Sequence, residues 1–418
     1  MKLSGAMLFA LLTSSCLLAA LVEGFLPLHS ARRNLPSHVV VGAYNTDDPT
    51  RGFGFALGLS PGKAAVVSEA KNPFFHGVKN LLPGQLFTSA PQTALFAAAV
   101  AFVGLFLNWF NKSIWTATRT YNQEANSVGK EYDAWTEEGI LEYYWGEHIH
   151  LGYYDDEEIA KGYKKKNFIQ AKYDFIDKMA KFGGVANLKP AKVLDVGCGI
   201  GGTTRYLARM YGEDSDVTGI SLSSNQVQRA TNLATEREIK NAKFQVMDAL
   251  KMDFPDNSFD VVWACESGEH MPDKKKYVEE MTRVLKPGGR IVIATWCQRD
   301  NHNKPFNKKE RQMLDFLYSE WTHPYFISIS DYAKLMLGTE QLDSIETDDW
   351  AKATIPSWRH SIWVGVFDPW PVFRRPHLWY KCFRDGLTLE RMHDAFTNGL
   401  MQYGMMTATK KAIPESLN

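Results

Sequence analysis

Cysteine is scarce in this sequence and shows no metal-binding or redox spacing. The 418 residues contain five cysteines, none of them in a C-x-x-C pair, which excludes a disulfide framework, a zinc ribbon and a thioredoxin-type site. An excess of charge of one sign is also lacking, because 47 Lys and Arg balance 47 Asp and Glu. Without a basic field the chain has no general affinity for nucleic acid, which we exclude as a partner. The 45% hydrophobic content still permits a sizeable globular core.

The first 90 residues lack the patterning of a folded domain and have the composition of a targeting leader. Residues 1–24 are typical of a signal peptide, with Lys2 before an apolar run that ends at Gly24. Residues 25–90 begin with a basic, hydroxylated segment without an acid before Asp47 and continue as a Gly-, Pro- and Ser-rich linker. This bipartite arrangement resembles the leaders that carry proteins into algal plastids. We therefore expect a plastid (chloroplast) membrane location, with plain secretion as the alternative.

Beyond the leader, the sequence has no apolar run of the ~20 residues that a transmembrane helix usually needs. Residues 93–110 come nearest, because 94–107 are uninterrupted apolar residues, followed by Trp109, Phe110 and the flanking Lys112. A terminal Trp beside a Lys is typical of a membrane interface. We expect this segment to be a hydrophobic membrane anchor, either a single span or a helix on the membrane surface.

A glycine-rich turn between a strand and a helix is the first feature of the sequence that indicates a ligand-binding site. Residues 193–197 form a short apolar strand that leads into glycines at 197, 199 and 201, and residues 203–210 follow as a helix. Such a turn brings backbone amides close to a ligand at the start of the helix. A dinucleotide site would require an acid after the next strand, 216–220, where the sequence has Ser221. An NAD molecule would therefore have no acidic residue to bind its ribose, which argues against a dinucleotide site.

Further strand and helix patterns follow the turn in the order of a doubly wound sheet. Strands are predicted at 244–249, 259–263 and 290–296, a helix at 273–285 and a last strand at 402–410. Over residues 192–300 this order resembles the class I S-adenosylmethionine (SAM) methyltransferases. The resemblance implies an α/β fold with a Rossmann-like sheet of seven strands, the last of them antiparallel.

The same resemblance implies SAM as the methyl donor and assigns its binding residues. The glycine turn would pass under the methionyl part, Asp195 would organise the turn, Asp248 and Ala249 would meet the adenine, and Glu266 would close the substrate side. The ribose contact falls to Ser221 or Leu222, where many relatives have an acid. The expected cofactor site comprises Asp195, Gly197, Cys198, Gly199, Gly201, Ser221, Leu222, Asp248, Ala249 and Glu266. No metal is expected, because the spacing of Glu147-His-Ile-His150 suggests no third ligand.

Two longer sequence motifs indicate a particular family within the class I methyltransferases. Glu266-Ser-Gly-Glu-His-Met-Pro-Asp-Lys274 and the upstream segment 132–153 are similar to the tocopherol methyltransferase family, including cyanobacterial enzymes that act on phytyl- and solanesyl-benzoquinols. The resemblance implies methylation of a ring carbon in a lipophilic, prenyl-tailed phenol, of the γ- to α-tocopherol type. A 2-methyl-6-phytyl- or solanesyl-1,4-benzoquinol is the alternative acceptor. A membrane-tethered SAM-binding protein without catalysis is the alternative of another class.

A base near the phenol hydroxyl would make the ring more nucleophilic. Glu269 and His270 directly follow the fourth predicted strand, where doubly wound sheets place their ligand crevice. His148 and His150, upstream of the glycine turn, are further candidates. We therefore expect Glu269, His270 and His150 to be catalytic, while His150 has the alternative role of packing a lid over SAM.

Tryptophan is concentrated near the C-terminus. Six of the twelve tryptophans follow residue 300, namely Trp321, Trp350, Trp358, Trp363, Trp370 and Trp379. We expect a methyltransferase domain at 125–418 with a SAM-binding core at 190–300 and an aromatic substrate cap at 301–400. Because indoles favour both apolar pockets and membrane interfaces, residues 370–379 are the expected membrane contact, with ordinary core packing as the alternative.

Overall fold

The computed structural model describes residues 90–116, 119 and 121–412 and divides the chain into two compact units, 1–107 and 108–418. The expected signal peptide and nearly all of the transit-like segment lie outside the described residues. Of the first unit only 90–107 are described, and they belong to helix α3 (Ala90–Trp115). Within the described part of the chain, no helix is both long enough and apolar enough to cross a bilayer. The membrane anchor at 93–110 stays a prediction.

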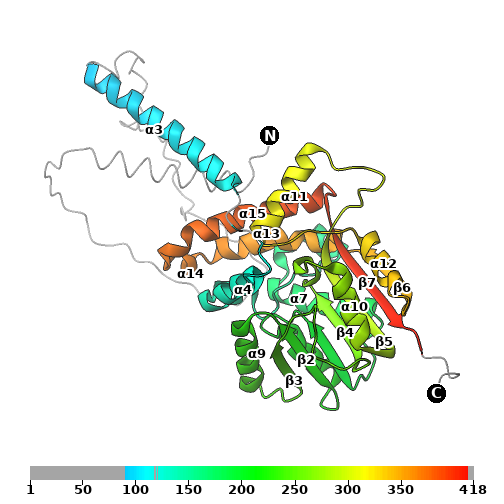
Figure 1. Ribbon diagram of the computed structural model, residues 1–418. Coiled ribbons are helices and arrows are strands. Elements are labelled where there is room, and N and C mark those ends of the chain that lie inside the picture. Colours follow the sequence, from blue (N-terminus) through cyan, green and yellow to red (C-terminus); the bar gives the residue numbers. More distant parts are fainter. Residues whose placement is uncertain (1–89, 117–118, 120, 413–418) are drawn as a thin grey trace, which may run out of the picture. The chain divides into compact units, whose positions relative to one another are not determined.

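A seven-stranded sheet forms the centre of the second unit, in the order β3-β2-β1-β4-β5-β7-β6 (Figure 1). Neighbouring strands are parallel except that β7 runs antiparallel to both β5 and β6, which confirms the predicted fold class. The strands are β1 (Lys192–Val196), β2 (Asp216–Ser221), β3 (Ala242–Val246), β4 (Phe259–Cys265), β5 (Leu285–Gln298), β6 (Leu342–Asp349) and β7 (Met401–Lys410). No pattern in the sequence predicts β6. As an edge strand it is mostly exposed and polar, so it lacks the apolar pattern that marks the other strands.

Helices cover both faces of the sheet, because successive strand residues point to opposite sides. Val193 and Val261 contribute to one buried cluster, while the adjacent Leu194 and Val262 contribute to the other. Helices α10 and α12 pack on the second cluster, and α7, α8, α11, α13 and α15 contribute to the first. These helices are α7 (Phe168–Phe182), α8 (Gly202–Tyr211), α10 (Lys274–Val284), α11 (Lys308–Glu320), α12 (Ile329–Gly338), α13 (Ala351–Phe367) and α15 (Trp379–Thr397). The remaining helices are α4 (Ser127–Glu138), α5 (Ile140–Trp145), α6 (Asp156–Lys161), η2 (Tyr163–Lys165), α9 (Ser224–Glu236), η3 (Gly268–His270), α14 (Trp370–Phe373) and η4 (Pro376–Leu378).

The interval 301–400 has two different parts. Helices α13 and α15 run side by side, with the short α14 at one end of the pair (Figure 1). Helix α12 and strand β6, in contrast, pack against the sheet and α10. The predicted cap therefore contains an insertion of helices and also a segment that completes the sheet.

The tryptophans of this interval divide between the core and the surface. Trp358 is fully buried and packs against Trp296, with ring centroids 5.1 Å apart. Trp370 and Trp379 instead expose 63% and 49% of their surface. Core packing thus accounts for Trp358 but not for the two tryptophans around α14.

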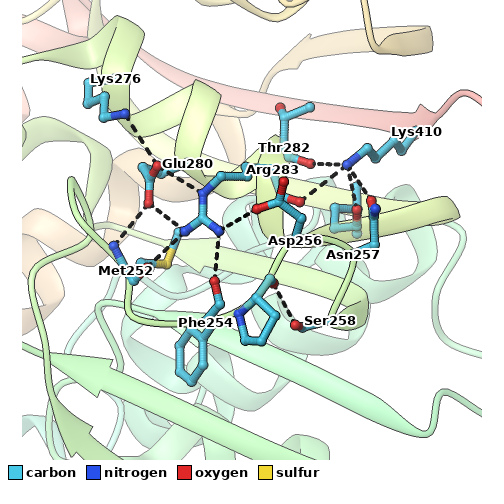
Figure 2. Close-up of polar contacts among 12 residues, drawn as sticks. Met252, Phe254, Asp256, Asn257, Ser258, Lys276, Glu280, Thr282, Arg283 and Lys410 are labelled. Atoms are coloured by element: carbon cyan, nitrogen blue, oxygen red, sulfur yellow. Dashed lines mark hydrogen bonds and ion pairs between the residues drawn. The ribbon is translucent and has the colours of Figure 1, made fainter.

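A network of charged groups fixes the loop between β3 and β4 against α10 (Figure 2). The guanidinium of Arg283 donates to the carbonyls of Phe254 (2.7 Å) and Met252 (2.8 Å) and to the carboxylate of Glu280. The ammonium of Lys410, the last residue of β7, donates to the carbonyl of Thr282 in the last turn of α10 and to that of Leu285, the first residue of β5. The loop held in this way begins at residues 248–250, which line the cavity described next.

Candidate active site

A cavity of about 320 Å³ lies at the carboxyl ends of β1, β2 and β4, where ligands bind in doubly wound sheets. Most of the predicted site residues line it: Asp195, Gly197, Cys198, Gly199, Ser221, Leu222, Asp248, Ala249, Glu266, His270 and His150. Gly201 and Glu269 were predicted as site residues but are not among those that line it. The structure therefore gathers the expected cofactor turn and two of the three expected catalytic side chains around one cavity.

The glycine turn has a left-handed backbone, with φ of 87° at Gly197 and 53° at Gly199. A Cβ on Gly197 would lie 2.3 Å from the Cβ of Ser267, whereas a Cβ on Gly199 would meet nothing nearer than 3.9 Å. The turn is thus packed at Gly197 and open at Gly199, which leaves a cradle for a ligand approaching the backbone.

Gly201 has a clear packing function, while its predicted contact with the cofactor stays a prediction. It precedes α8 with a φ of 78°, and a Cβ there would lie 2.4 Å from the ring of Phe244. Only glycine allows this helix to start so close to an aromatic ring on β3.

The acidic end of β1 is buried beneath the turn. Asp195 is 2% exposed and accepts a 2.6 Å hydrogen bond from the Thr204 hydroxyl of α8. Burial raises the pKa of the Asp195 carboxyl to about 7, against the opposing effect of that hydrogen bond. Ser221, at the end of β2, donates to the side chain of Gln226 at 2.9 Å. Asp248, in contrast, is exposed at the cavity and accepts a hydrogen bond from the backbone of Leu250.

Two glutamates three residues apart face different surroundings. Glu266 has a left-handed φ of 49°, and its Oε1 accepts from the Leu151 amide (2.8 Å) and the Tyr403 hydroxyl (2.6 Å). Burial raises the pKa of Glu266 to about 7. Glu269 is 1% exposed and accepts from the Thr295 hydroxyl at 2.7 Å; burial and the nearby charge of Glu266 raise its pKa to about 8. Glu266 borders the cavity, whereas Glu269 lies behind its wall.

The two cavity-lining histidines are held in a neutral state. His150 Nδ1 donates to the Leu151 carbonyl at 2.8 Å, so the opposite nitrogen, Nε2, carries a lone pair. This Nε2 is buried and has no hydrogen-bond partner among the described residues. His270 Nε2 lies 3.0 Å from the Tyr132 hydroxyl. Burial lowers the pKa of His150 to about 4 and that of His270 to about 3, and the positive charge of Lys274 contributes at His270.

One wall of the cavity comes from a segment to which sequence analysis gave no role. Residues around the start of α4, including Tyr121, Asn126 and Tyr132, line the cavity. Asp133 of the same helix accepts hydrogen bonds from the Ser223 hydroxyl and the Asn225 amide at the start of α9. Tyr121 and Asn126 lie outside the motif at 132–153, because nothing local in the sequence shows that this segment folds over the distant glycine turn.

The turn η3, which carries His270, is closed by a buried ammonium group. Lys274 is 2% exposed, and its Nζ donates to the carbonyls of Gly268 (2.8 Å), Glu269 (2.9 Å) and Met271 (2.8 Å). All three N–H donors of the side chain are thereby satisfied. Lys274 acts on the site by holding the backbone to which His270 belongs.

Replacing Lys274 with methionine should lower kcat by about 10- to 100-fold, because a small misplacement of site groups has effects of this size. The affinity for SAM should change much less, since the glycine turn is not part of η3. Calorimetric binding of SAM and steady-state rates would check this. Lys275→Met, on an exposed neighbour with a side chain 72% accessible, is the matched control. A wild-type kcat for Lys274→Met would contradict the positioning function.

The comparisons with known proteins agree with this geometry. A protein-family profile described as a methyltransferase domain matches residues 188–339. The 2-methyl-6-phytyl-1,4-hydroquinone methyltransferase of Synechocystis sp. is 45% identical over 299 residues, which are 69% of this chain and 89% of that protein. The chloroplastic tocopherol O-methyltransferase of Arabidopsis thaliana is 36% identical over 288 residues, which are 65% of this chain and 79% of that protein.

Solved structures are similar in fold. Geranyl diphosphate C-methyltransferase from Streptomyces coelicolor A3(2) superposes with a TM-score of 0.53 at 19% identity, covering 68% of this chain and 96% of that one. Phosphoethanolamine N-methyltransferase 2 of Haemonchus contortus gives a TM-score of 0.53 at 18% identity, covering 67% of this chain and 57% of that one. At these identities the likeness concerns the fold alone.

Proposed function

This chain belongs to the tocopherol methyltransferase family of SAM-dependent methyltransferases, and from this premise we propose that it methylates a ring carbon of a phytyl-tailed hydroquinone. The main support for the proposal is that the open glycine turn and His150 line the same cavity. The Nε2 of this neutral histidine has no hydrogen-bond partner among the described residues. Because the family consists of enzymes, the alternative of a SAM-binding protein without catalysis is set aside.

The choice between the two acceptors follows the degree of similarity. The sequence motifs favour γ-tocopherol as the acceptor, with the 2-methyl-6-phytyl-benzoquinol as the alternative. Identity is 45% to the cyanobacterial hydroquinone methyltransferase and 36% to the plant tocopherol enzyme, which supports the reverse order. We therefore propose 2-methyl-6-phytyl-1,4-hydroquinone as the acceptor and keep γ-tocopherol as the second candidate.

The residues of the glycine turn would hold the methyl donor. SAM, when bound, supplies an electrophilic methyl group on a sulfonium. The backbone at Gly199 is open for its approach, and the buried Asp195 carboxyl fixes the turn through α8. Ser221, at the end of β2, and Asp248, two residues after β3, would offer polar groups to the nucleoside, and the apolar Ala249 would offer a surface for a base.

The acceptor would be activated by the histidine side of the cavity. His150 Nε2 accepts a hydrogen bond from the ring hydroxyl, which raises electron density on the ring carbons that are attacked. When the new carbon–carbon bond has formed, that ring carbon must lose its proton. Glu266, which lines the same cavity and has a carboxyl pKa of about 7, is the proposed group that takes it. Tyr132 and His270 would bound the ring from α4 and η3.

Transfer of label from SAM tests the proposed function. The purified full-length protein is incubated with methyl-labelled SAM and either 2-methyl-6-phytyl-1,4-hydroquinone or γ-tocopherol. We expect label in the hydroquinone, at a kcat/KM above that for γ-tocopherol. Label only in γ-tocopherol would establish the second candidate instead, and label in neither compound would reject both.

The proposed place of action is a plastid membrane reached through the leader at 1–24 and 25–90. The chloroplastic plant relatives and the composition of the leader support this. A membrane is also where a phytyl-tailed substrate dissolves.

A further inference from the structure

The α14 end of the cap presents an unusually apolar surface to solvent. Phe367, Trp370 and Phe373 expose 70%, 63% and 55% of their surface. Together with neighbours that are about half exposed they form what we call the aromatic tip: Val366, Phe367, Trp370, Phe373, Trp379 and Tyr380. Large exposed side chains are unremarkable when scattered, but a contiguous group of them marks an interaction surface.

Three rings of the aromatic tip lie next to one another. The ring centroids of Trp370 and Phe373 are 6.2 Å apart, and those of Phe373 and Trp379 are 5.8 Å apart. The indole nitrogen of Trp379 donates to the Val372 carbonyl at 3.0 Å. This polar group is therefore satisfied within the protein while the rest of the ring stays exposed, an arrangement that suits contact with an apolar phase.

Positive charge borders the aromatic tip. Arg374 and Arg375 are exposed directly beside it. Lys381 follows on α15, where its ammonium is ion-paired with the Glu138 carboxylate at 2.8 Å, so the two arginines supply the positive charge. Asp368 is the single acidic residue in 366–381, and its carboxylate accepts a 2.7 Å hydrogen bond from Tyr143. Aromatic side chains flanked by arginine match the chemistry of a bilayer surface, where apolar chains lie beneath anionic headgroups.

We propose that the aromatic tip is the face with which this enzyme docks on a bilayer containing anionic lipids. The proposal rests on the proposed function, because a phytyl-tailed acceptor must be taken from a bilayer. A symmetric contact between two copies of the tip would bring Arg374 and Arg375 of both chains together, which opposes self-association through this face. A lipid surface removes that repulsion and buries the rings as well.

Hydrogen–deuterium exchange of the full-length protein tests the docking face directly. Vesicles of phosphatidylcholine with added phosphatidylglycerol should slow amide exchange in 366–381, and phosphatidylcholine alone should slow it less. Exchange in α9, an element of the SAM-binding core, should not change. No slowing in 366–381 would overturn the proposal, and equal slowing by the neutral vesicles would overturn its electrostatic part. Slowing that depends on protein concentration without vesicles would indicate self-association instead.

A double variant, Phe367→Ser with Phe373→Ser, tests the functional consequence. Because burying one such side chain contributes roughly tenfold to a partition constant, turnover of the phytyl-tailed hydroquinone in vesicles should fall at least tenfold. Turnover of the same ring without its tail, in solution, should stay at the wild-type rate. Leu337→Ser, at a position 66% exposed on α12, is the matched control. Equal activity of variant and control in vesicles would overturn the proposal.

The two proposals fail in different ways. Wild-type protein that methylates neither ring would reject the proposed function, while the exchange experiment would still report on docking. Wild-type activity without protection of 366–381 would reject docking alone.

Discussion

Replacing Gly197 with alanine is expected to lower SAM affinity by roughly 100-fold, the equivalent of about 3 kcal/mol. Two effects add at this position. The φ of 87° is strained for any residue with a Cβ, and the new methyl group would lie 2.3 Å from the Cβ of Ser267. Ser267 has little freedom to move, since its hydroxyl bonds the Val196 carbonyl at 2.6 Å and the Tyr277 hydroxyl at 2.9 Å. The turn itself must therefore shift, and with it the amides that face the ligand.

Gly212→Ala separates the two effects. Gly212 directly follows α8 with a φ of 84°, but a Cβ there would meet no atom within 4 Å. This variant should lose about 1 kcal/mol of folding stability, from backbone strain alone, and bind SAM like the wild type. Calorimetric titration and thermal unfolding of both variants give the comparison. Wild-type SAM affinity for Gly197→Ala would show that the cofactor does not depend on this turn.

Replacing His150 with phenylalanine should reduce kcat about 100-fold, the usual contribution of a positioned acid–base group. Phenylalanine keeps the packing against Phe175, whose ring centroid is 5.3 Å away, but removes the Nε2 lone pair. SAM affinity should stay near the wild-type value, because the glycine turn is untouched. Single-turnover rates and SAM titration separate the chemical step from cofactor binding.

His148→Phe is the matched control, since His148 is equally buried two residues earlier but does not line the cavity. Burial lowers the pKa of His150 to about 4, so the neutral imidazole persists well below pH 6.5. The contribution of this group to the rate should therefore be lost only as the pH falls toward 4. A wild-type kcat for His150→Phe would remove His150 from the proposed mechanism.

The other two predicted catalytic residues, His270 and Glu269, have different surroundings in the structure. His270 lines the cavity, but its Nε2 is already engaged with the Tyr132 hydroxyl. Glu269 is enclosed behind the wall with Thr295 as its partner. Because both residues follow β4, they were expected at the ligand crevice, and both lie close to it. Their place in the sequence does not show which of the two side chains faces the cavity. His150 and His270 each keep one buried nitrogen without a hydrogen-bond partner among the described residues, Nε2 of His150 and Nδ1 of His270.

Local sequence patterns were sufficient to predict the central strands and the glycine turn of this protein. A short apolar strand, a glycine turn and a helix are determined by interactions between residues close in sequence, so β1, the turn and α8 were predictable, as was the order of the central strands. The edge strand β6 was not, because a strand with one neighbour and mostly exposed side chains carries little apolar signal. The targeting leader and the membrane anchor rest on composition alone and stay predictions.

What the tertiary structure decided is which side chains face the cavity. Gly197 and Gly201 look alike in sequence, yet the first meets Ser267 beside the ligand cradle and the second meets Phe244 beneath a helix. Glu266 and Glu269 are three residues apart, yet the left-handed backbone at Glu266 turns the chain so that only one of them borders the site. Tyr132 and His150 reach the same cavity from outside the sheet. Such differences arise from packing between segments distant in sequence, whose relative positions no local pattern contains.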